Sequence, residues 1–415
     1  MVGAGPVGLF TALVLTSRGV RVQVVDRAAH TGTRSYALAL HAEALRLFEE
    51  FGLLAPALEH ARRIRTVGLY DGERRRGELR LTDLAEDHSF VSVLPQSALE
   101  QLLEKALAER GVHVDWCHSV QDLRADDGGV DVTIDRLSLD TLGYSVQHAE
   151  WVVAKTTEQH FPFVIGADGN ASVVRRRLDI GFPVYGDRTE FSVYEFRTDA
   201  DLGSEMRLGF DRGATSVCWP MPGNICRWSF QRALDAGSAD RQKDQSLVQP
   251  ADERHPDLTD ERLLQLLRHR APWFHGNVLG IRWRMEVRFE NRLADSFGRG
   301  RTWLVGDAGH LTGPAGIQSM NVGLREAIEL ASGIADAVQG RGTVALERYD
   351  QARRTEWRAL LGLDPLLQPT PSADPWLVDN LARLLPCVPA SGRDLVQLMA
   401  QVGISSKSGL FAAAR

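Results

Sequence analysis

Three glycines near the N-terminus have the spacing of a dinucleotide-binding turn. Gly3, Gly5 and Gly8 form a Gly-x-Gly-x-x-Gly pattern that leads into an apolar, helical stretch over residues 9–17. In such a turn the first glycine permits a tight bend, the second lets a pyrophosphate approach the backbone, and the third lets helix and strand pack closely. The N-terminus of the helix then faces the anion. The pattern predicts a dinucleotide site.

An acidic residue follows this turn at a suitable distance. Residues 20–25 alternate between valine and other residues as in a strand, which ends at Asp26, 18 residues after Gly8. A carboxylate there is expected to accept hydrogen bonds from an adenosine ribose, which favours FAD or NAD over NADP at this turn. Arg27 joins the predicted cofactor-binding residues. A role for Asp26 in capping a turn is the alternative.

Two later strand ends carry an aspartate beside a glycine. Asp168 and Gly169 follow one predicted strand, and Gly306 and Asp307 follow another, buried strand. A long helix is predicted from about Gly316 to Val338. Each aspartate alone could belong to an ordinary turn, but the ordered set with the N-terminal glycines indicates one elongated cofactor site.

The three motifs, in this order, resemble the single-component FAD-dependent aromatic hydroxylases, the para-hydroxybenzoate hydroxylase family of flavoprotein monooxygenases. The resemblance covers roughly residues 1–354. It implies that Asp307 binds the ribityl chain of FAD and that the backbone N–H groups of Met320 and Asn321 lie near flavin O2, where a helix N-terminus stabilises the anion of reduced flavin. The other residues that it implies for cofactor binding are Arg34, Gln96, Asp168, Gly169, Gly306, Pro314 and Gly316.

The chain departs from the family pattern around the long helix. Gly309 stands where the family has alanine, and Ile317 and Ser319 stand where it favours glycine. Larger side chains beside the flavin could change the mobility of the ring, which in the family couples reduction to the arrival of substrate. His310 is expected to be a packing or hydrogen-bonding residue.

The implied fold is α/β, a doubly wound, Rossmann-like FAD domain with an inserted antiparallel β-sheet substrate module and a short helical C-terminal tail. The expected boundaries are 1–181 and 291–360 for the two parts of the FAD domain, 182–290 for the substrate module and 361–415 for the tail. Only two residues precede Gly3, fewer than a first strand requires, so we expect the natural chain to begin a few residues upstream.

The predicted substrate module is rich in aromatic residues. Because one face of its sheet must look toward the flavin, Trp219, Arg227 and Trp283 are candidate substrate contacts, and a place in the core is the alternative for the two tryptophans. Residues 37–51 are expected to form a helix, and residues 233–256 a polar loop. Thr259 is expected to cap a helix.

The resemblance implies an FAD-dependent monooxygenase with NADPH or NADH as a transient electron donor. Reduced flavin would capture O2 as a C4a-hydroperoxide and insert one oxygen atom into an aromatic or polyketide-like small molecule, in bacterial secondary metabolism or aromatic breakdown. No catalytic side chain is assigned, because the flavin carries the difficult step. An FAD-dependent reductase or halogenase of the same fold, and a non-catalytic FAD-binding protein, are the alternatives.

Composition restricts the partners. The 415 residues carry a net charge of −6, which argues against a nucleic-acid surface. No apolar run approaches the roughly 20 residues of a membrane span. The four cysteines are too scattered to predict a disulfide framework or a metal site. We therefore expect a cytoplasmic protein, as a monomer or homodimer.

Overall fold

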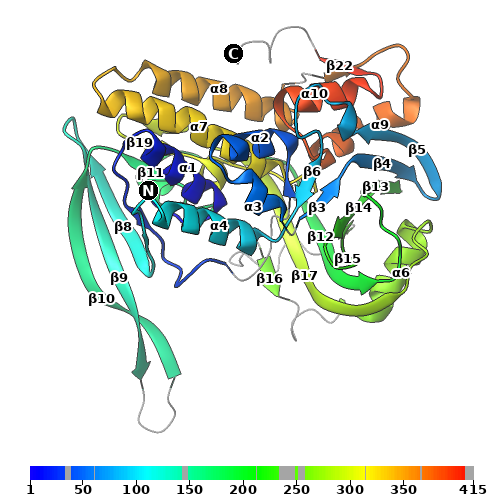
Figure 1. The fold of residues 1–415 in the computed structure, drawn as a ribbon, viewed down its shortest axis with the longest axis horizontal. Helices are drawn as coiled ribbons and strands as arrows, with labels where there is room; N and C mark the ends of the chain where they lie inside the picture. The colour runs from blue at the N-terminus through cyan, green and yellow to red at the C-terminus, as the bar shows by residue number, and fades with distance from the viewer. Residues whose placement is uncertain are drawn as a thin grey trace.

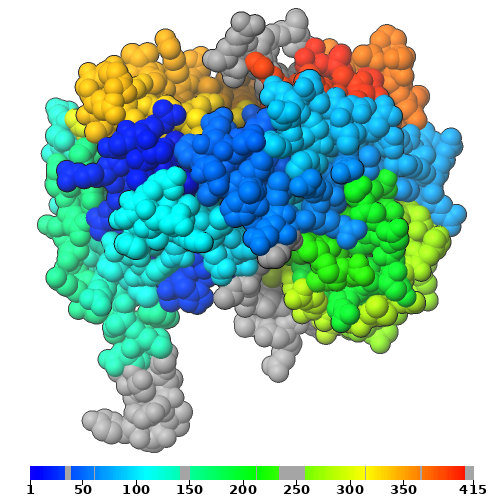
Figure 2. Space-filling view, viewed as in Figure 1, coloured from blue at the N-terminus to red at the C-terminus, as the bar shows by residue number. Residues whose placement is uncertain are grey.

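The computed structural model describes residues 1–32, 39–59, 61–142, 148–211, 213–232, 248–250, 258–313, 315–364 and 367–406. These residues form an α/β body with a large sheet, antiparallel except for the pairing of β13 with β4, on one side and a three-stranded arm on the other (Figure 1). In the space-filling view, the N-terminal segments, coloured blue to cyan, cover the middle of one face (Figure 2).

A small parallel sheet carries the glycine-rich turn. Its members, in spatial order, are β7 (Val114–Asp115), β1 (Val24–Val25), the bridging residue Val2, β11 (Val164–Gly166), β19 (Thr302–Leu304) and the antiparallel β18 (Gly298–Arg299). The N–H of Val2 donates to the carbonyl of Ile165 and that of Gly3 to the carbonyl of Val25, each at 2.9 Å. The residues before the turn therefore join the two halves of the sheet.

Four helices pack against one another beside this sheet. They are α1 (Pro6–Ser17), α4 (Gln96–Ala108), α7 (Gln318–Val338) and α8 (Val344–Leu360). Helix α1 contacts both α4 and α7, and α8 lies along α7 (Figure 1). Leu9, Phe10 and Leu13 of α1 are fully buried in the main core. This packing brings the start of α1 close to the segment from which α7 begins.

A nine-stranded sheet forms the opposite wall of the molecule. Its strands, in spatial order, are β16 (Val248–Pro250), β17 (Val278–Leu293), β12 (Val184–Thr198), β15 (Ile225–Gln231), β14 (Ala214–Met221), β13 (Glu205–Asp211), β4 (Thr66–Asp71) and β5 (Arg74–Arg80), with β20 (His310–Leu311) paired to β17. Trp228 and Phe230 stack at 5.1 Å in the core cluster that includes apolar residues of helix α6 (Asp260–Arg270). Thr259 caps α6 by accepting a hydrogen bond from the N–H of Arg262, as predicted.

The remaining elements surround these two sheets. Strands β8 (His118–Ala125), β9 (Val130–Leu142) and β10 (His148–Phe161) form the arm. The others are α2 (Ala42–Glu50), α3 (Leu54–Leu58), α5 (Val173–Arg177), the sheet β2 (Ala39–Leu40), β6 (Val91–Val93) and β3 (Arg62–Ile64), the short helices η1 (Leu81–Asp83) and η3 (Gly306–Ala308), and the C-terminal α9 (Pro375–Leu384), η4 (Leu385–Cys387), α10 (Gly392–Ala400), β21 (Leu367–Pro369) and β22 (Ile404–Ser406).

Two local predictions are wrong. Helix α2 begins at Ala42 rather than at residue 37, because Ala39 and Leu40 pair with β6 as strand β2. Of the predicted polar loop, the structure describes only residues 248–250, which form strand β16 and pair with β17, so the prediction is wrong there, and the rest of the loop lies outside the described residues. In the part of the chain that the structure describes, every helix is too short or too polar to cross a lipid bilayer.

The crowding at Gly3 gives a test of the turn. Gly3 has φ +104°, and a Cβ there would lie 2.3 Å from the carbonyl oxygen of Ala167, whereas Gly19 has φ +78° and open space around it. We expect Gly3→Ala to lower the free energy of unfolding by more than about 2 kcal/mol, from steric overlap and backbone strain together. Gly19→Ala should cost about 1 kcal/mol, from the left-handed backbone alone. Urea unfolding of both variants measures this, and equal losses would contradict the assigned crowding.

Candidate functional site

A cavity of about 360 Å³ lies between the glycine-rich turn, the start of α7 and one face of the nine-stranded sheet. Most of its lining is apolar. The predicted residues that line it are Gly5, Gly8, Gln96, Gly169, Asp307, Met320, Trp219, Arg227 and Trp283. Those outside the lining are Gly3, Asp26, Arg27, Asp168, Gly306, Gly316 and Asn321. Arg34 and Pro314 lie outside the described residues.

Helix α1 opens directly onto the cavity. Its N-cap, Gly5, has no side chain with which to cap the first turn, and Pro6 follows it. Asp26 accepts hydrogen bonds from the N–H groups of Ala4 and Ala28, both at 2.7 Å, and so fixes the turn from behind. Arg27 is exposed. Backbone N–H groups of the first helical turn that lack partners within the helix form an anion site.

Asp168 positions a second wall of the cavity. Its carboxylate accepts hydrogen bonds from the hydroxyl of Ser172 at 2.5 Å and from the N–H of Val173 at 2.6 Å. Burial raises the pKa of Asp168, and these hydrogen bonds oppose the rise. The carboxylate therefore caps the short helix α5, while the next residue, Gly169, faces the cavity.

The start of α7 is held by the C-terminal tail. The N-cap residue Ile317 has φ +54°, a left-handed conformation that is strained for a β-branched side chain. Gly316 donates to the carbonyl of Pro386 at 3.0 Å, and a Cβ there would lie 2.7 Å from the same oxygen. The side-chain amide of Gln318 donates to the carbonyl of Leu385, also at 3.0 Å. Helix η4 of the tail thus fixes the backbone that approaches the cavity.

Asn321 and His41 brace the same turn from the other side. The side-chain amide of Asn321 donates to the carbonyl of Ile317 at 2.8 Å, and its oxygen accepts the N–H of His41 at 2.7 Å. The His41 ring bonds through Nε2 to the carbonyl of Gly316 at 2.8 Å, so Nε2 must carry the hydrogen. Burial lowers the pKa of His41 to about 3, although the bond to Gly316 opposes the fall. His41 is therefore neutral and structural.

Asp307 places a carboxylate on the cavity wall. It accepts a hydrogen bond from the hydroxyl of Ser319 at 2.6 Å, and Ser319 also lies 3.2 Å from Nδ1 of His310. Burial raises the pKa of Asp307, while His310 and Ser319 oppose the rise. Asp307 is accessible from the cavity, although protein atoms surround it closely.

Glu326 anchors this arrangement from inside the protein. One oxygen lies 2.9 Å from Nε2 of His310 and accepts the N–H of Gly306, and the other accepts the indole N–H of Trp357 at 2.8 Å. Burial alone would raise the pKa of Glu326, but His310, Arg353 and Trp357 together lower it to about 2. Glu326 is thus ionised.

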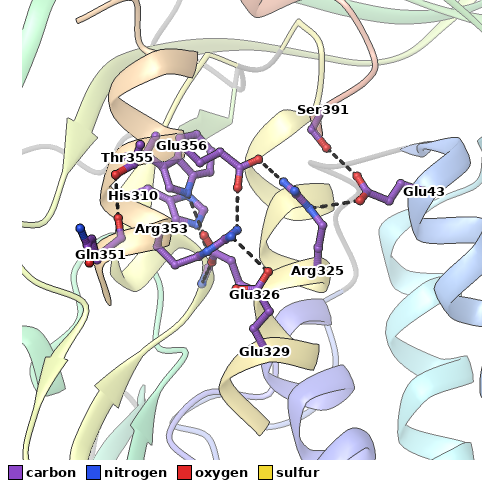
Figure 3. Close-up of polar contacts among 12 residues, drawn as sticks. Glu43, His310, Arg325, Glu326, Glu329, Gln351, Arg353, Thr355, Glu356 and Ser391 are labelled. Carbon is purple, nitrogen blue, oxygen red and sulfur yellow. Dashed lines mark hydrogen bonds and ion pairs between the residues drawn. The ribbon is translucent and has the colours of Figure 1, made fainter. Parts of the chain in front are cut away.

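The buried charges continue away from the cavity. Arg353 bonds Glu356 at 2.7 Å and Glu329 at 3.1 Å, and Glu356 also pairs with Arg325. Arg325 lies 3.4 Å from Glu43 of α2 (Figure 3). This network ties α2, α7 and α8 together beneath the site.

A row of side chains crosses four strands of the large sheet. Trp219 of β14, Arg227 of β15, Glu195 of β12 and Trp283 of β17 are register neighbours and so point to one face. Arg227 and Glu195 are buried and paired at 2.7 Å, and the Arg227 guanidinium lies 4.8 Å from the centre of the Trp283 ring. Burial lowers the pKa of Arg227, and Glu195 opposes this.

Trp219 also connects the two walls. Its indole N–H donates to the carbonyl of Ala315, at 3.2 Å, in the segment before α7. Position in the sheet therefore brings all three candidate substrate contacts to the cavity, whereas Trp228 and Phe230 belong to the core behind the sheet.

Sequence reasoning did not assign Glu195, His41, Glu326 or the η4 segment to the site. Glu195 faces Arg227 only through strand pairing, and no local spacing reveals such a partner. Ser319 was noted as a departure from the family pattern, but its contacts with Asp307 and His310 were not predicted.

The residues present fit FAD. The uncapped start of α1 and the side-chain-free surfaces of Gly5 and Gly169 can receive a pyrophosphate, while Asp307 and the start of α7 offer an acceptor and N–H donors further along the same cavity. The model of the FAD binding domain family matches residues 1–362. The chain belongs to this family of FAD-binding proteins.

Relatives and solved structures agree with this assignment. The FAD-binding chain is 30% identical over 347 residues to 6-methylpretetramide 4-monooxygenase of Streptomyces rimosus, covering 81% of this chain. It spans 55% of the length of that relative. The resemblance to FAD-dependent aromatic hydroxylases is confirmed.

The α/β fold class is also confirmed. The fold matches p-nitrophenol 4-monooxygenase PnpA of Pseudomonas putida DLL-E4, with a TM-score of 0.70 at 19% identity over 97% of this chain and 95% of that one. It also matches aklavinone-11 hydroxylase in its complex with FAD and aklavinone, with a TM-score of 0.66 at 22% identity over 87% of this chain and 67% of that one.

The neutral state of His41 predicts a pH dependence. Its pKa is about 3 in the folded protein and near 6.5 when unfolded, so only the unfolded chain gains a proton as the pH falls below 6.5. The stabilisation is complete above pH 6.5 and is lost toward pH 3. Between pH 7 and pH 5, protonation of His41 in the unfolded chain should therefore lower the free energy of unfolding by roughly 2 kcal/mol.

The variant His41→Gln can keep a donor to Gly316 but cannot titrate. In this variant, we expect the difference in unfolding free energy between pH 7 and pH 5, measured with urea, to be smaller than in the wild type by roughly 2 kcal/mol. His113→Gln, at an exposed position, is the control and should keep the wild-type difference. An unchanged difference in His41→Gln would contradict the assignment.

Proposed function

We propose that this protein is an FAD-dependent monooxygenase that uses NADPH or NADH and O2 to oxygenate an aromatic or polyketide-like small molecule. The observation that carries the proposal is that the glycine-rich turn, Asp307 and an aromatic sheet face bound the same cavity. When bound, FAD supplies the electron transfer from the nicotinamide donor to O2. The relative and one of the two solved structures are named as monooxygenases, and the other structure as a hydroxylase. These names support oxygenation as the reaction of this protein.

In this proposal each segment has a separate task. Residues 1–181 and 291–360 hold FAD through the start of α1, Gly169, Asp307 and the start of α7. Residues 182–290 supply the wall against which a substrate packs, and the tail from residue 361 onward fixes the start of α7. Apolar side chains such as Val193, Met285 and Val287 keep water from the space between the walls.

The charge on Arg227 suggests the kind of substrate. Glu195 pairs with Arg227 at 2.7 Å, so these two side chains together carry no net charge. A neutral pair suits a neutral oxygen, a phenol or a ring carbonyl, better than a free carboxylate, which would add an uncompensated buried charge. Trp219 and Trp283 provide flat surfaces beside this pair. We therefore propose a neutral, planar, oxygen-bearing aromatic substrate.

We also expect the protein to act in the cytoplasm, as a monomer or homodimer, with NADPH or NADH as its electron donor.

An oxygenation assay tests the reaction class. Purified protein that has bound FAD is mixed with NADPH or NADH under ¹⁸O2, with and without candidate phenols. We expect substrate-stimulated O2 uptake and a product that carries one ¹⁸O atom. Nicotinamide oxidation without oxygen incorporation would indicate a reductase, a halide-dependent product a halogenase, and inert bound FAD a non-catalytic protein. Each of these results contradicts the proposal.

A matched pair of probes and variants tests the substrate wall. We expect 1-naphthol to bind more tightly than 1-hydroxy-2-naphthoic acid, as measured by perturbation of the flavin spectrum. Arg227→Met alone should destabilise the fold by about 3–5 kcal/mol, because Glu195 is left buried and unpaired.

The double variant Arg227→Met/Glu195→Gln removes both charges together. It should recover most of the stability and all of the FAD content but bind 1-naphthol at least about tenfold more weakly, the loss expected for a hydrogen bond to a charged group. Arg282→Met is the control, since its exposed side chain lies 4.0 Å from Glu195. Unchanged 1-naphthol binding by the double variant would overturn the proposed contact.

A further inference from the structure

A chain of polar contacts leads from the cavity into the core. Asp307, on the cavity wall, accepts from Ser319 at 2.6 Å, Ser319 lies 3.2 Å from Nδ1 of His310, and Nε2 of His310 lies 2.9 Å from Glu326. His310 and Glu326 are completely buried. The mechanism proposed above uses neither of them.

The hydrogens in this chain can be counted. Both oxygens of Glu326 accept N–H donors, one from Gly306 and the other from Trp357, so the carboxylate acts as an acceptor and Nε2 of His310 carries the hydrogen of their contact. Ser319 has a single hydroxyl hydrogen but two contacts. If that hydrogen points to Asp307, Nδ1 of His310 must donate to Ser319, and the ring is a cation. If it points to Nδ1, Asp307 must be protonated and donate to Ser319.

These two arrangements give every contact one hydrogen, and they differ by one transferred proton. In the transfer, the Asp307 O–H bond breaks as its proton forms a new bond to the oxygen of Ser319. The original hydroxyl proton of Ser319 moves to Nδ1 of His310. The total charge is unchanged, and no oxidation or reduction occurs.

We propose that Asp307, Ser319 and His310 share one transferable proton, and that a hydroxyl group binding to Asp307 drives this proton through Ser319 to His310. The inference rests on the proposed contact between Asp307 and FAD, whose ribityl hydroxyls are donors of the required kind. A donor that binds Asp307 favours the carboxylate over the acid, and hence the arrangement with a cationic His310. Ser319 is a positioning residue. Glycine, which the family favours at this position, has no hydroxyl with which to connect Asp307 and His310.

The surroundings of His310 suit a cation that appears on binding. Trp357 stacks on the ring with centroids 3.8 Å apart, and such a face attracts a cation. Glu326 balances the charge (Figure 3). The titratable and charged groups near the pair are Asp307 on η3, Glu326 on α7, and Tyr349 and Arg353 on α8.

Histidine NMR tests the transfer without measuring activity. The protein is labelled with ¹³C at histidine Cε1, and the His310 signal is assigned by its loss in His310→Gln. Spectra at pH 8 are compared for the apoprotein and the FAD-bound protein. We expect the signal to move to the imidazolium position when FAD binds. In Ser319→Ala it should remain at the neutral position, and FAD should bind about tenfold more weakly.

Three variants keep the test decisive if Ser319→Ala folds poorly. Ser319→Thr retains the hydroxyl and should restore the response, whereas Asp307→Asn has no carboxylate and should leave His310 neutral with FAD bound. Ser332→Ala is the matched control on the same helix and should behave as wild type, because its hydroxyl donates to the backbone of Ile328, outside the chain of contacts at His310.

A His310 signal that does not change on FAD binding, or that changes equally in Ser319→Ala, would overturn the shared proton. Failure of the wild-type protein to take up FAD, seen in the flavin absorbance of the same samples, would instead overturn the proposed cofactor contact. The two failures are therefore distinguishable.

Discussion

Two helices that begin at one cavity impose the main constraint on this structure. The first N–H groups of an α-helix have no partner within the helix. Neither Gly5 at the start of α1 nor Ile317 at the start of α7 makes a side-chain capping bond. Both starts therefore suit an external acceptor, and an elongated anionic cofactor can meet both at once. The parallel sheet and the packing of α1 against α7 serve to keep these two starts in place.

The interior around α7 is specialised for the same purpose. The left-handed conformation of Ile317 carries a cost, which the tail at Pro386 and the brace of His41 and Asn321 offset. Beneath the helix, Glu326 and its ionic neighbours link α7 to α8 and α2. Buried charges of this kind gain little net stability over apolar packing, but they fix geometry. A well-defined start of α7 is what the proposed flavin contacts require.

Patterns of residues close together in the sequence predict part of this fold. The tight turn at Gly3, the helix that follows it and the Thr259 cap depend on residues close in sequence, and the structure has all three. Partners set by sheet pairing were not predictable: Glu195 meets Arg227 only because β12 and β15 are neighbours in the sheet. The strand at Ala39 was mistaken for a helix because its apolar residues continue the pattern of α2, and only pairing with β6 decides it. Tertiary contacts thus supplied what periodicity could not.

A crystal structure of the protein with FAD tests the central claim most directly. The account predicts the pyrophosphate at the start of α1, a ribityl hydroxyl within hydrogen-bond distance of Asp307, and the flavin ring between the start of α7 and the face that carries Trp219 and Trp283. FAD bound at any other surface, or a dinucleotide with its flavin turned away from Asp307, would contradict it.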